Sequence, residues 1–540
     1  MEKTIVVSQR QPFTFDLCQE MLPRVDSQRM VAHCSPANTQ LPGSCLYIDM
    51  PWSTLLTAFS AVVHTKDDER GSLMEQIEAL WSTGRAQVET RPSDFAASKT
   101  VPVDSSRLTA TPPSTKRSTT DVDCSTGSDS LVCISVRTGL DLFLQAKRYA
   151  QGSCILMTGI NIPDMSYVIR QNGLVPVPVD IDAVTLQPNI AHCESTLRAL
   201  HKQGKSVSAF LVAHLWGKRI ALDTALKFAR HHNLSFIEDC AEAYSGPDYR
   251  GDDRSDIALF SFGSIKVGTA FGGALVRVPN DRIVLDRMRQ LHRSFPVQPR
   301  SMYLKKIMKN IAIMTLLNLN SVNKWGTLLL RRGLGIDSKP YVVAMLRGFP
   351  GDDLIKQLRQ QPATPLLTVF LDRLTHFDRN AFAKGKHNGD HMLEIVNRIE
   401  RGAPPSVVPA AADAAPTTRG GSFARVMHPG TGAAQCNYWL FPLLVPDAEW
   451  MVEELNRNGV DAYRGATQLA AVSTPVDLGN LPRSVQSEDI MQHCIYLPVH
   501  RGMGPRRIAA IGAALSRCID RYEAAGEPAG AAAAAVRSRL

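Results

Sequence analysis

Long apolar segments are absent from this sequence of 540 residues. No run approaches the ~18 apolar residues that a membrane-spanning helix needs, and the first residues, MEKTIVVSQRQPF, lack the charged-then-apolar order of a secretory signal. Charged residues make up 21% and hydrophobic residues 44%, which is close to globular usage and excludes a mainly disordered or fibrous chain. We therefore expect a soluble, non-secreted protein of more than one domain.

The motifs of several enzyme classes are also missing. The sequence contains no Walker-type phosphate loop, no G-x-S-x-G nucleophile turn and no H-E-x-x-H pair. Its eleven cysteines form no C-x-x-C pair and no Cys/His cluster at zinc spacing, so we expect free thiols in a reducing compartment and no structural metal. The net charge of +9 is compatible with an anionic substrate, a nucleic acid or an acidic membrane, and does not choose among them.

Changes in composition divide the chain into segments. A Ser/Thr/Pro-rich stretch and a Pro/Ala-rich stretch have the composition of a disordered insertion and a loop. The expected order is an N-terminal segment 1–95, a disordered insertion 96–130, a large domain 131–281, a basic helical insertion 282–350, connecting helices 351–401, a Pro/Ala-rich loop 402–422, a small C-terminal domain 423–525 and a flexible tail 526–540.

The fold class follows from the pattern of apolar runs. Between 131 and 281, short apolar runs such as LVCIS, CILMTGI, SAFLVAHLW and IALFSF alternate with helical stretches. Strands that alternate with helices indicate a mostly parallel sheet covered on both faces. Residues 423–525 have a similar but shorter pattern. We predict an α/β protein with a large sheet domain and a smaller C-terminal α/β domain.

Residues 282–332 carry eleven Lys or Arg residues and a single acid, Asp286. Apolar residues such as Ile307 and Met314 are interleaved with them. Such a helix can lie on an anionic membrane surface. The alternative is a solvated, partly packed helical insertion, which we favour because helices with basic faces are common in soluble proteins. Both interpretations stay open at this point.

The stretch FIEDCAEAYSGPDYRGDDRSDIALFSFGSIKVGTAFGGALVRV, residues 236–278, is the most informative part of the sequence. An apolar strand ends in Glu238 and Asp239, and ligands of open α/β sheets bind where strands end. A second apolar strand, 257–262, leads to Lys266 and a glycine-rich stretch. A lysine just beyond a buried strand is partly desolvated, which lowers its pKa and makes its amine a better nucleophile.

These residues resemble the DegT/StrS family of sugar-nucleotide aminotransferases, which use pyridoxal phosphate (PLP). The resemblance also covers VPVPVDIDAVTLQPN (175–189), FLVAHLWGKRIALD (210–223), NYWLFPLLVP and YLPVH, or about 230 residues together. It implies the PLP-dependent transferase fold of type I, which is aspartate-aminotransferase-like. It also implies that Lys266 is the Schiff-base lysine, that Asp239 pairs with the cofactor's ring nitrogen, and that Ser261 binds its phosphate.

The sequence departs from the family pattern at several positions. Where the family has a Ser-Gly-Thr phosphate loop, this chain has Ser-Val-Arg-Thr-Gly at 135–139, so the resemblance assigns the phosphate to Arg137 or Thr138 beside a helix start. Glu242 stands where Gln or His commonly lies near the phenolic oxygen. An aliphatic residue, Ile162 or Met165, replaces the aromatic that stacks on the ring. The family's Asn-Tyr-Arg motif is not legible.

Two functions are open on this basis. The first is a PLP-dependent aminotransferase that moves an amino group from an amino-acid donor to an anionic keto-sugar, as a homodimer without nucleic acid. The second is a protein of the same fold that acts as a binding or regulatory partner without transamination. His214, Arg464 and His500 lie in family-like contexts, but a single histidine at a strand end is more often structural.

The last three residues, Ser538-Arg539-Leu540, are a conservative variant of the Ser-Lys-Leu tripeptide of peroxisomal import. They follow an Ala-rich stretch that could present them to a receptor. A short ending of this kind also arises by chance. We expect a peroxisomal or glycosomal location, with the cytoplasm as the alternative.

Overall fold

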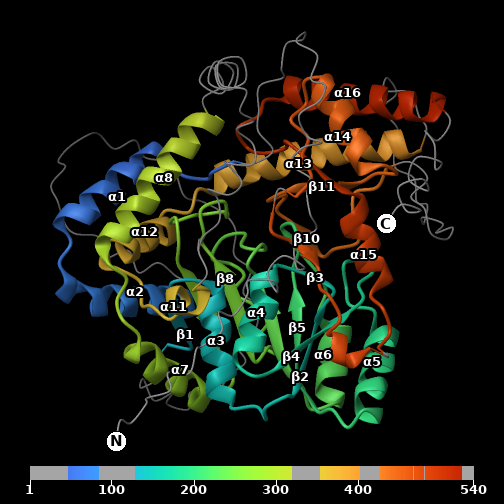
Figure 1. Cartoon of the computed structure of the whole chain (residues 1–540). Coiled ribbons are helices and arrows are strands. Elements are labelled where there is room, and N and C mark those ends of the chain that lie inside the picture. Colours follow the sequence, from blue (N-terminus) through green and yellow to red (C-terminus); the bar gives the residue numbers. More distant parts are fainter. Residues whose placement is uncertain are drawn as a thin grey trace, which may run out of the picture. The chain divides into compact units, whose positions relative to one another are not determined.

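The computed structural model describes residues 47–83, 128–318, 353–401, 426–465, 467–479 and 481–525. The core of the large domain is a sheet of seven strands in the order β1-β9-β8-β7-β5-β2-β4 (Figure 1). Only β9 runs antiparallel to its neighbours, so the sheet is mostly parallel, as predicted. The strands are β1 (Ser130–Cys133), β2 (Cys154–Thr158), β4 (Val175–Val179), β5 (Val207–Ala213), β7 (Ser235–Asp239), β8 (Ile257–Ser261) and β9 (Ala274–Arg277).

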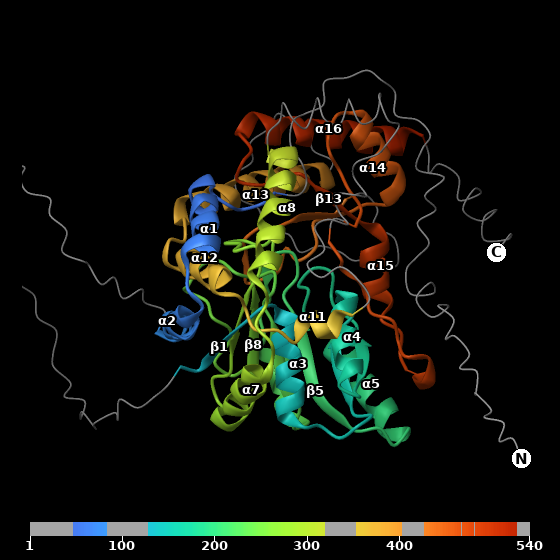
Figure 2. The same ribbon diagram turned by 60° about the vertical axis from the view of Figure 1, so that its left-hand side comes forward.

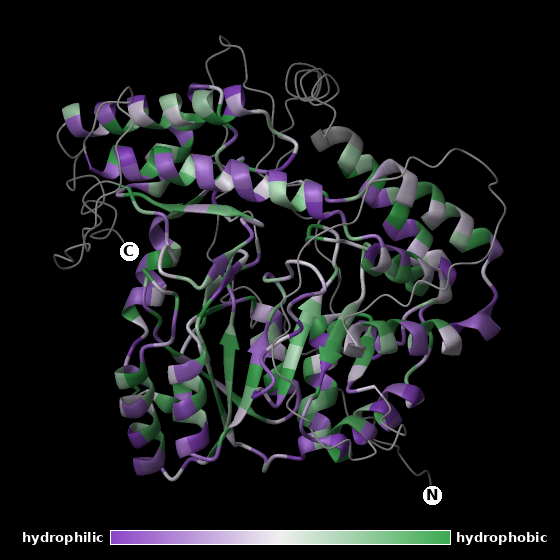
Figure 3. Ribbon diagram, turned by 180° about the vertical axis from the view of Figure 1, so that it is seen from behind, coloured by the Kyte–Doolittle hydropathy of each residue, from purple (hydrophilic) through white to green (hydrophobic). Residues whose placement is uncertain are grey.

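Helices cover both faces of this sheet. Successive side chains of a strand point to opposite faces, so Phe210 of β5 packs into one hydrophobic cluster and Leu211 into another. Figure 3 shows the strands as mainly hydrophobic and the outer sides of the helices as hydrophilic. The covering helices are α3 (Val136–Lys147), α4 (Pro163–Gln171), α5 (Ile190–Lys202), α6 (Asp223–His231) and α7 (Arg282–Ser294).

A group of further helices packs beside β8 and β9. They are α1 (Trp52–His64), the short η2 (Asp67–Glu69), α2 (Arg70–Thr83), α8 (Arg300–Asn318), α11 (Leu354–Leu358) and α12 (Thr364–Thr375). Helix α12 contacts α1, α2 and α8, and α1 and α8 lie side by side in Figure 2. Trp81 of α2 is fully buried against Phe260 of β8. The N-terminal segment is thus folded onto the large domain over 47–83.

The C-terminal part has its own hydrophobic cluster, as predicted for a smaller α/β domain. It contains α13 (Arg379–Glu400), β11 (Phe441–Leu444), α14 (Ala448–Arg457), η3 (Val476–Leu478), α15 (Val485–His493), β13 (Cys494–Leu497) and α16 (Pro505–Ala524). Two short ladders join it to the large domain: β10 (Gln435–Cys436) pairs with β6 (Lys218–Arg219), and β12 (Ala470–Ala471) pairs with β3 (Ile160–Asn161). These ladders bring residues 426–525 over the edge where the parallel strands end.

Two elements differ in detail from the expected division of the chain. Strand β1 begins at Ser130, inside the predicted disordered insertion, because its partner β9 supplies the hydrogen bonds that a local sequence pattern cannot show. Helix α7, predicted as part of a basic insertion, packs on α3 and β1 through Val284, Leu285 and Met288. Most of 96–130, all of 402–422 and the tail with Ser538-Arg539-Leu540 lie outside the described residues.

Some of the apolar side chains of the basic segment are buried, whereas Met302 and Met308 of α8 are exposed. Tyr303, Ile307, Ile313 and Met314 of α8 are buried in the cluster that contains α12. These residues are therefore not available to a membrane surface, and residues 319–332 lie outside the described residues. Within the described part of the chain, no helix combines the length and apolar character required to cross a membrane.

Candidate active site

Asp239 and Lys266 follow neighbouring strands of the sheet. Asp239 is the last residue of β7, and its partner in the parallel ladder is Leu259 of β8. Strand β8 ends at Ser261, and the chain then turns through a loop that carries Lys266. Both side chains thus lie at the carboxyl edge of the sheet, where open α/β sheets bind ligands.

The amine of Lys266 is held between a carboxylate and an aromatic ring. Its Nζ lies 3.3 Å from Oε1 of Glu242 and 3.6 Å from the ring centroid of Trp439. The indole N–H of Trp439 donates to the carbonyl of Ile265, which fixes the ring over the loop. Trp439 precedes β11, so the C-terminal domain supplies one wall of the lysine's surroundings.

Burial lowers the pKa of Lys266 from its ordinary value. The carboxylates of Glu242 and Asp239 oppose this shift, and the guanidinium of Arg137 adds to it. A lowered pKa increases the fraction of neutral amine, the form that attacks a carbonyl carbon. Four predicted site residues therefore interact electrostatically: Lys266, Glu242, Asp239 and Arg137.

Asp239 is buried and accepts one hydrogen bond, from the backbone N–H of Ala241 to Oδ1 (3.0 Å). In the part of the chain that the structure describes, no other hydrogen bond reaches this carboxylate. Burial, with a smaller contribution from Glu242, raises its pKa to about 6, although the hydrogen bond from Ala241 and the charges of Lys266 and His214 oppose the shift. One carboxylate oxygen is thus left for an N–H group of a ligand.

The carboxylate of Glu242 accepts hydrogen bonds from both the amine of Lys266 and the backbone of Trp216. Its Oε1 accepts from Lys266, while its Oε2 accepts from the backbone N–H of Trp216 (2.8 Å). The carboxylate is therefore fixed and acts as the counter-ion of the amine.

Replacement of Glu242 by glutamine should lower the pKa of Lys266 further, because the carboxylate now stabilises the charged amine. The measurement is the pH dependence of amine labelling at Lys266, followed by mass spectrometry. We expect half-maximal labelling at a lower pH than in the wild type. The control is Glu449→Gln, since Glu449 pairs with Arg464 at the surface. An unchanged or higher pH would show that Glu242 is not the counter-ion.

The start of α3 was predicted to bind phosphate through Arg137 or Thr138. The hydroxyl of Thr138 donates to the carbonyl of Leu358 (2.8 Å) and is fully buried, so it serves the packing of α11. Ser135 caps the helix by accepting from the N–H of Thr138. Arg137 is ion-paired with Asp164 and is partly exposed.

The predicted phosphate ligand Ser261 and the predicted ring covers Ile162 and Met165 differ in burial. Ser261 is partly buried, with its Oγ 3.5 Å from the N–H of Gly263. Ile162 precedes α4 and packs against clusters on both faces of the sheet, while Met165 is buried in one of them. Their roles as phosphate ligand and ring cover stay predictions.

The three less specific candidates do not gather at Lys266. His214 is fully buried and bonded to Glu238. His500 stacks on Tyr47 at 4.6 Å, and burial, with two nearby arginines, lowers its pKa to about 4. Arg464 pairs with Glu449 and donates to a backbone carbonyl. All three have partners of their own among the described residues, and their roles as substrate contacts stay predictions.

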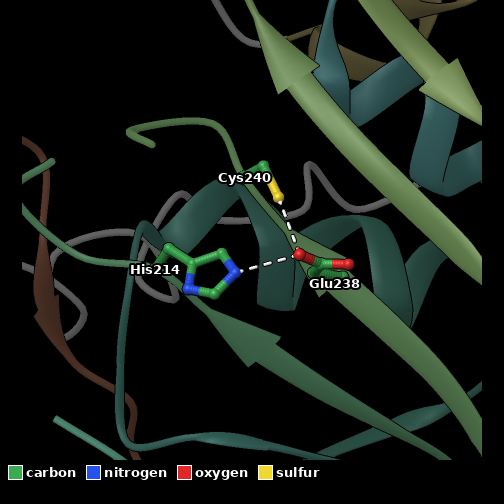
Figure 4. Close-up of side chains that lie close together, drawn as sticks. All are labelled: His214, Glu238 and Cys240. Atoms are coloured by element: carbon green, nitrogen blue, oxygen red, sulfur yellow. Dashed lines mark hydrogen bonds and ion pairs between the residues drawn. The ribbon is translucent and has the colours of Figure 1, made fainter. Parts of the chain in front are cut away.

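Figure 4 shows that the side chains of His214, Glu238 and Cys240 lie close together. Their potential ligand atoms lie within 4.8 Å of one another, a spacing that a metal ion could bridge. However, Oε1 of Glu238 already accepts from His214 (3.0 Å), Cys240 (3.2 Å) and Tyr249. Oε2 accepts from Asp252 N–H and from Ser255, both at 2.8 Å. We interpret the group as a buried hydrogen-bond network.

Glu238→Gln should destabilise the fold by about 3–5 kcal/mol, the cost of breaking a buried ionic network. Burial alone would raise the pKa of Glu238, but its donors outweigh burial and lower the pKa to about 2. The stabilisation by the carboxylate is therefore present above the ordinary pKa and is lost as pH falls towards 2. Urea denaturation of Glu238→Gln and of exposed Glu394→Gln measures the difference, and equal stabilities would refute this role.

Three residues of the site were missed by sequence reasoning. Trp439 covers Lys266. Asp49, from the N-terminal segment, accepts from the N–H of Gly268 (2.9 Å) and pairs with arginines 373 and 501. Lys306 of α8 lies beside Gly272. Only Trp439 belongs to a motif that could have indicated it, NYWLFPLLVP.

Residues 127–312 match the DegT/DnrJ/EryC1/StrS aminotransferase family. GDP-perosamine synthase of Caulobacter vibrioides is 32% identical over 170 residues, which are 30% of this chain and 42% of that protein. The L-glutamine:scyllo-inosose aminotransferase of Streptomyces griseus is 32% identical over 155 residues, 27% of this chain and 35% of the other. A pleiotropic regulatory protein of Geobacillus stearothermophilus is 27% identical over 180 residues, 32% and 44% of the two chains. The chain thus spans less than half the length of these relatives.

Solved structures extend the likeness to the whole fold. NtdA from Bacillus subtilis, with bound cofactor PMP, has a TM-score of 0.56 at 13% identity, covering 93% of this chain and 91% of the other. DesI, in the presence of its TDP-sugar product, has a TM-score of 0.53 at 16% identity, covering 90% and 95%. The predicted fold class is therefore confirmed. Over residues 127–312, the chain is similar to the DegT/DnrJ/EryC1/StrS aminotransferase family.

Proposed function

We propose that this chain is a PLP-dependent aminotransferase whose acceptor is an anionic keto-sugar and whose donor is an amino acid. The observation that carries the proposal is the pair of Asp239 and Lys266 at the ends of adjacent parallel strands. Asp239 is buried with one oxygen left for a ligand, and Lys266 has a lowered pKa. Few other functions need a buried carboxylate and a desolvated amine on one edge of a sheet.

The residues present fit PLP. Asp239 can accept from a protonated pyridine nitrogen, Lys266 can hold the carbonyl carbon, and Ser261, Arg137 and the start of α3 offer donors for a phosphate. When bound, PLP supplies an electron sink for the carbon that loses or gains a proton. The departures at Glu242 and Thr138 change the local contacts but leave these three functions in place.

The chain's own residues then have defined tasks. Asp239 keeps the proton on the ring nitrogen, because a buried carboxylate beside it favours the charged form. Lys266 would hold the cofactor through its amine, and the same amine would be placed to move a proton at the substrate carbon that bears nitrogen. Glu242 is placed to hold the amine in position between these steps. The ring of Trp439 covers one side of the amine.

The substrate class comes from the relatives. GDP-perosamine synthase, the scyllo-inosose aminotransferase and DesI with its TDP-sugar product are named for sugars or a sugar-like cyclitol. A net charge of +9 suits an anionic carrier. We also propose a homodimer, by analogy with a family that builds each site from two subunits. Light scattering at micromolar concentration measures this, and an active monomer would refute it.

A protein without transaminase activity is the second candidate. The ring of Trp439 lies 3.6 Å from the amine of Lys266, so the amine already has an aromatic partner within the chain. One relative is named a pleiotropic regulatory protein. In this case PLP, if bound at all, would not be consumed by an amino donor.

One experiment separates the two candidates. The full chain is loaded with PLP and incubated with single amino acids, and PLP and pyridoxamine phosphate are quantified after denaturation. An aminotransferase converts PLP into pyridoxamine phosphate and releases an equal amount of keto acid from the donor. A nucleotide-linked keto-sugar then converts pyridoxamine phosphate back into PLP. Stable PLP with every donor would contradict the aminotransferase and support the regulatory candidate.

A further inference from the structure

The glycine-rich loop after Lys266 returns to the start of α3. The N–H of Gly273 donates to the carbonyl of Ile134 (3.0 Å), and the N–H of Gly272 donates to the carbonyl of Phe262 (3.1 Å). Ile134 directly precedes Ser135, the cap of α3. Gly272 therefore lies between the turn that begins α3 and the strand end that carries Ser261.

Helix α8 places a lysine on this glycine. A Cβ at Gly272 would lie 3.2 Å from Nζ of Lys306, tighter than nine in ten real Cβ contacts, so the amine approaches the glycine closely and would have to shift by a few tenths of an ångström for a larger residue. The helix is fixed on both sides of Lys306. The hydroxyl of Tyr303 donates to the carbonyl of Ala270 (2.9 Å), and the side chain of Ile307 is fully buried.

Positive groups converge at this point. Burial, together with the charges of Lys309 and Arg137, lowers the pKa of Lys306 to about 8. Arg137 also acts on Lys266, as noted above. The first-turn N–H groups of α3 after its cap add the positive end of a helix dipole. An anion bound among these groups would offset their mutual repulsion.

We propose that Lys306, supplied by α8 of the same chain, binds the phosphate of PLP together with Arg137 and the start of α3. This inference rests on the proposed function. A phosphate dianion accepts charge-assisted hydrogen bonds from an ammonium group, and these are stronger than neutral ones. Lys306 thus performs the task that the hydroxyl of Thr138, bonded to Leu358, does not perform.

The test compares two lysines of one helix. Lys306→Met removes the charge beside Gly272, whereas Lys305→Met removes the charge of its exposed neighbour. Equilibrium dialysis of each full chain measures the dissociation constants of PLP and of pyridoxal, which lacks the phosphate. We expect Lys306→Met to weaken PLP binding by about 10- to 100-fold, the range for a hydrogen bond to a charged group, and to leave pyridoxal binding unchanged. Lys305→Met should bind both as the wild type does, and Lys306→Arg should recover part of the loss.

The other possible outcomes contradict either the role of Lys306 or the proposed function. Wild-type PLP binding in Lys306→Met would overturn the role of Lys306 and leave the proposed function intact. An equal loss of PLP and pyridoxal would show that Lys306 acts on the fold and not on the phosphate, which also overturns the inference. A wild-type chain that retains neither compound would contradict the proposed function itself.

Discussion

Replacing Lys266 by alanine is expected to lower the turnover of amino donor and keto-sugar by about 10⁴-fold, the upper end of the range for a general acid-base group. The loss should be this large because the same amine holds the cofactor and moves the proton. The overall fold should persist, since Lys266 lies on a loop and its neighbours Trp439 and Glu242 have other partners.

Steady-state kinetics and urea denaturation of the same preparation measure the two parts of this expectation. Lys305→Ala serves as the control, because Lys305 is an exposed lysine of α8. Turnover in Lys266→Ala at the level of the control would refute the assignment. A chain that no longer unfolds cooperatively would make its kinetics uninformative, in which case Lys266→Met, which keeps the stem, replaces it.

Asp239→Asn should lower kcat by about 10²- to 10³-fold, the loss typical of removing one preorganised electrostatic partner of a transition state. An amide does not hold a proton on the ring nitrogen as a carboxylate does, so PLP accepts electrons less well. Binding of PLP should change less than kcat, because the lysine and the phosphate contacts remain.

The matched control is Asp253→Asn, since Asp253 is 82% exposed and pairs with Arg277 at the surface. Pre-steady-state measurement of the first half-reaction isolates the step in which the proton moves. Full activity of Asp239→Asn would assign the ring nitrogen to another carboxylate. Glu242 would then be the first to test, because the oxygens of Glu238 are occupied by five donors.

The sequence predicted those parts of the site that are local in the chain. Glu238 and Asp239 end one strand and Glu242 follows it closely. Ser261 ends the next strand and Lys266 follows it. In a parallel sheet the carboxyl ends of neighbouring strands share one edge, so two local patterns place their residues together. The alternation of strands and helices predicted the sheet for the same reason.

The remaining parts depend on contacts between distant segments. Trp439 meets the loop of Lys266 only after the C-terminal domain has folded over the sheet, and Lys306 meets Gly272 only because Tyr303 and Ile307 anchor α8. The hydroxyl of Thr138 could be expected at an anion site until Leu358, 220 residues later, proved to be its partner. A local sequence pattern does not predict contacts between segments that are far apart in the chain.

The central claim is that Lys266 is the residue that holds PLP. The most direct measurement is to load the full chain with PLP, reduce it with sodium borohydride and map the modified peptide by mass spectrometry. The account predicts one pyridoxyl group per chain, located on Lys266, and none on Lys306 or Lys305. A label on another lysine, or no stable label in the wild-type chain, would contradict it.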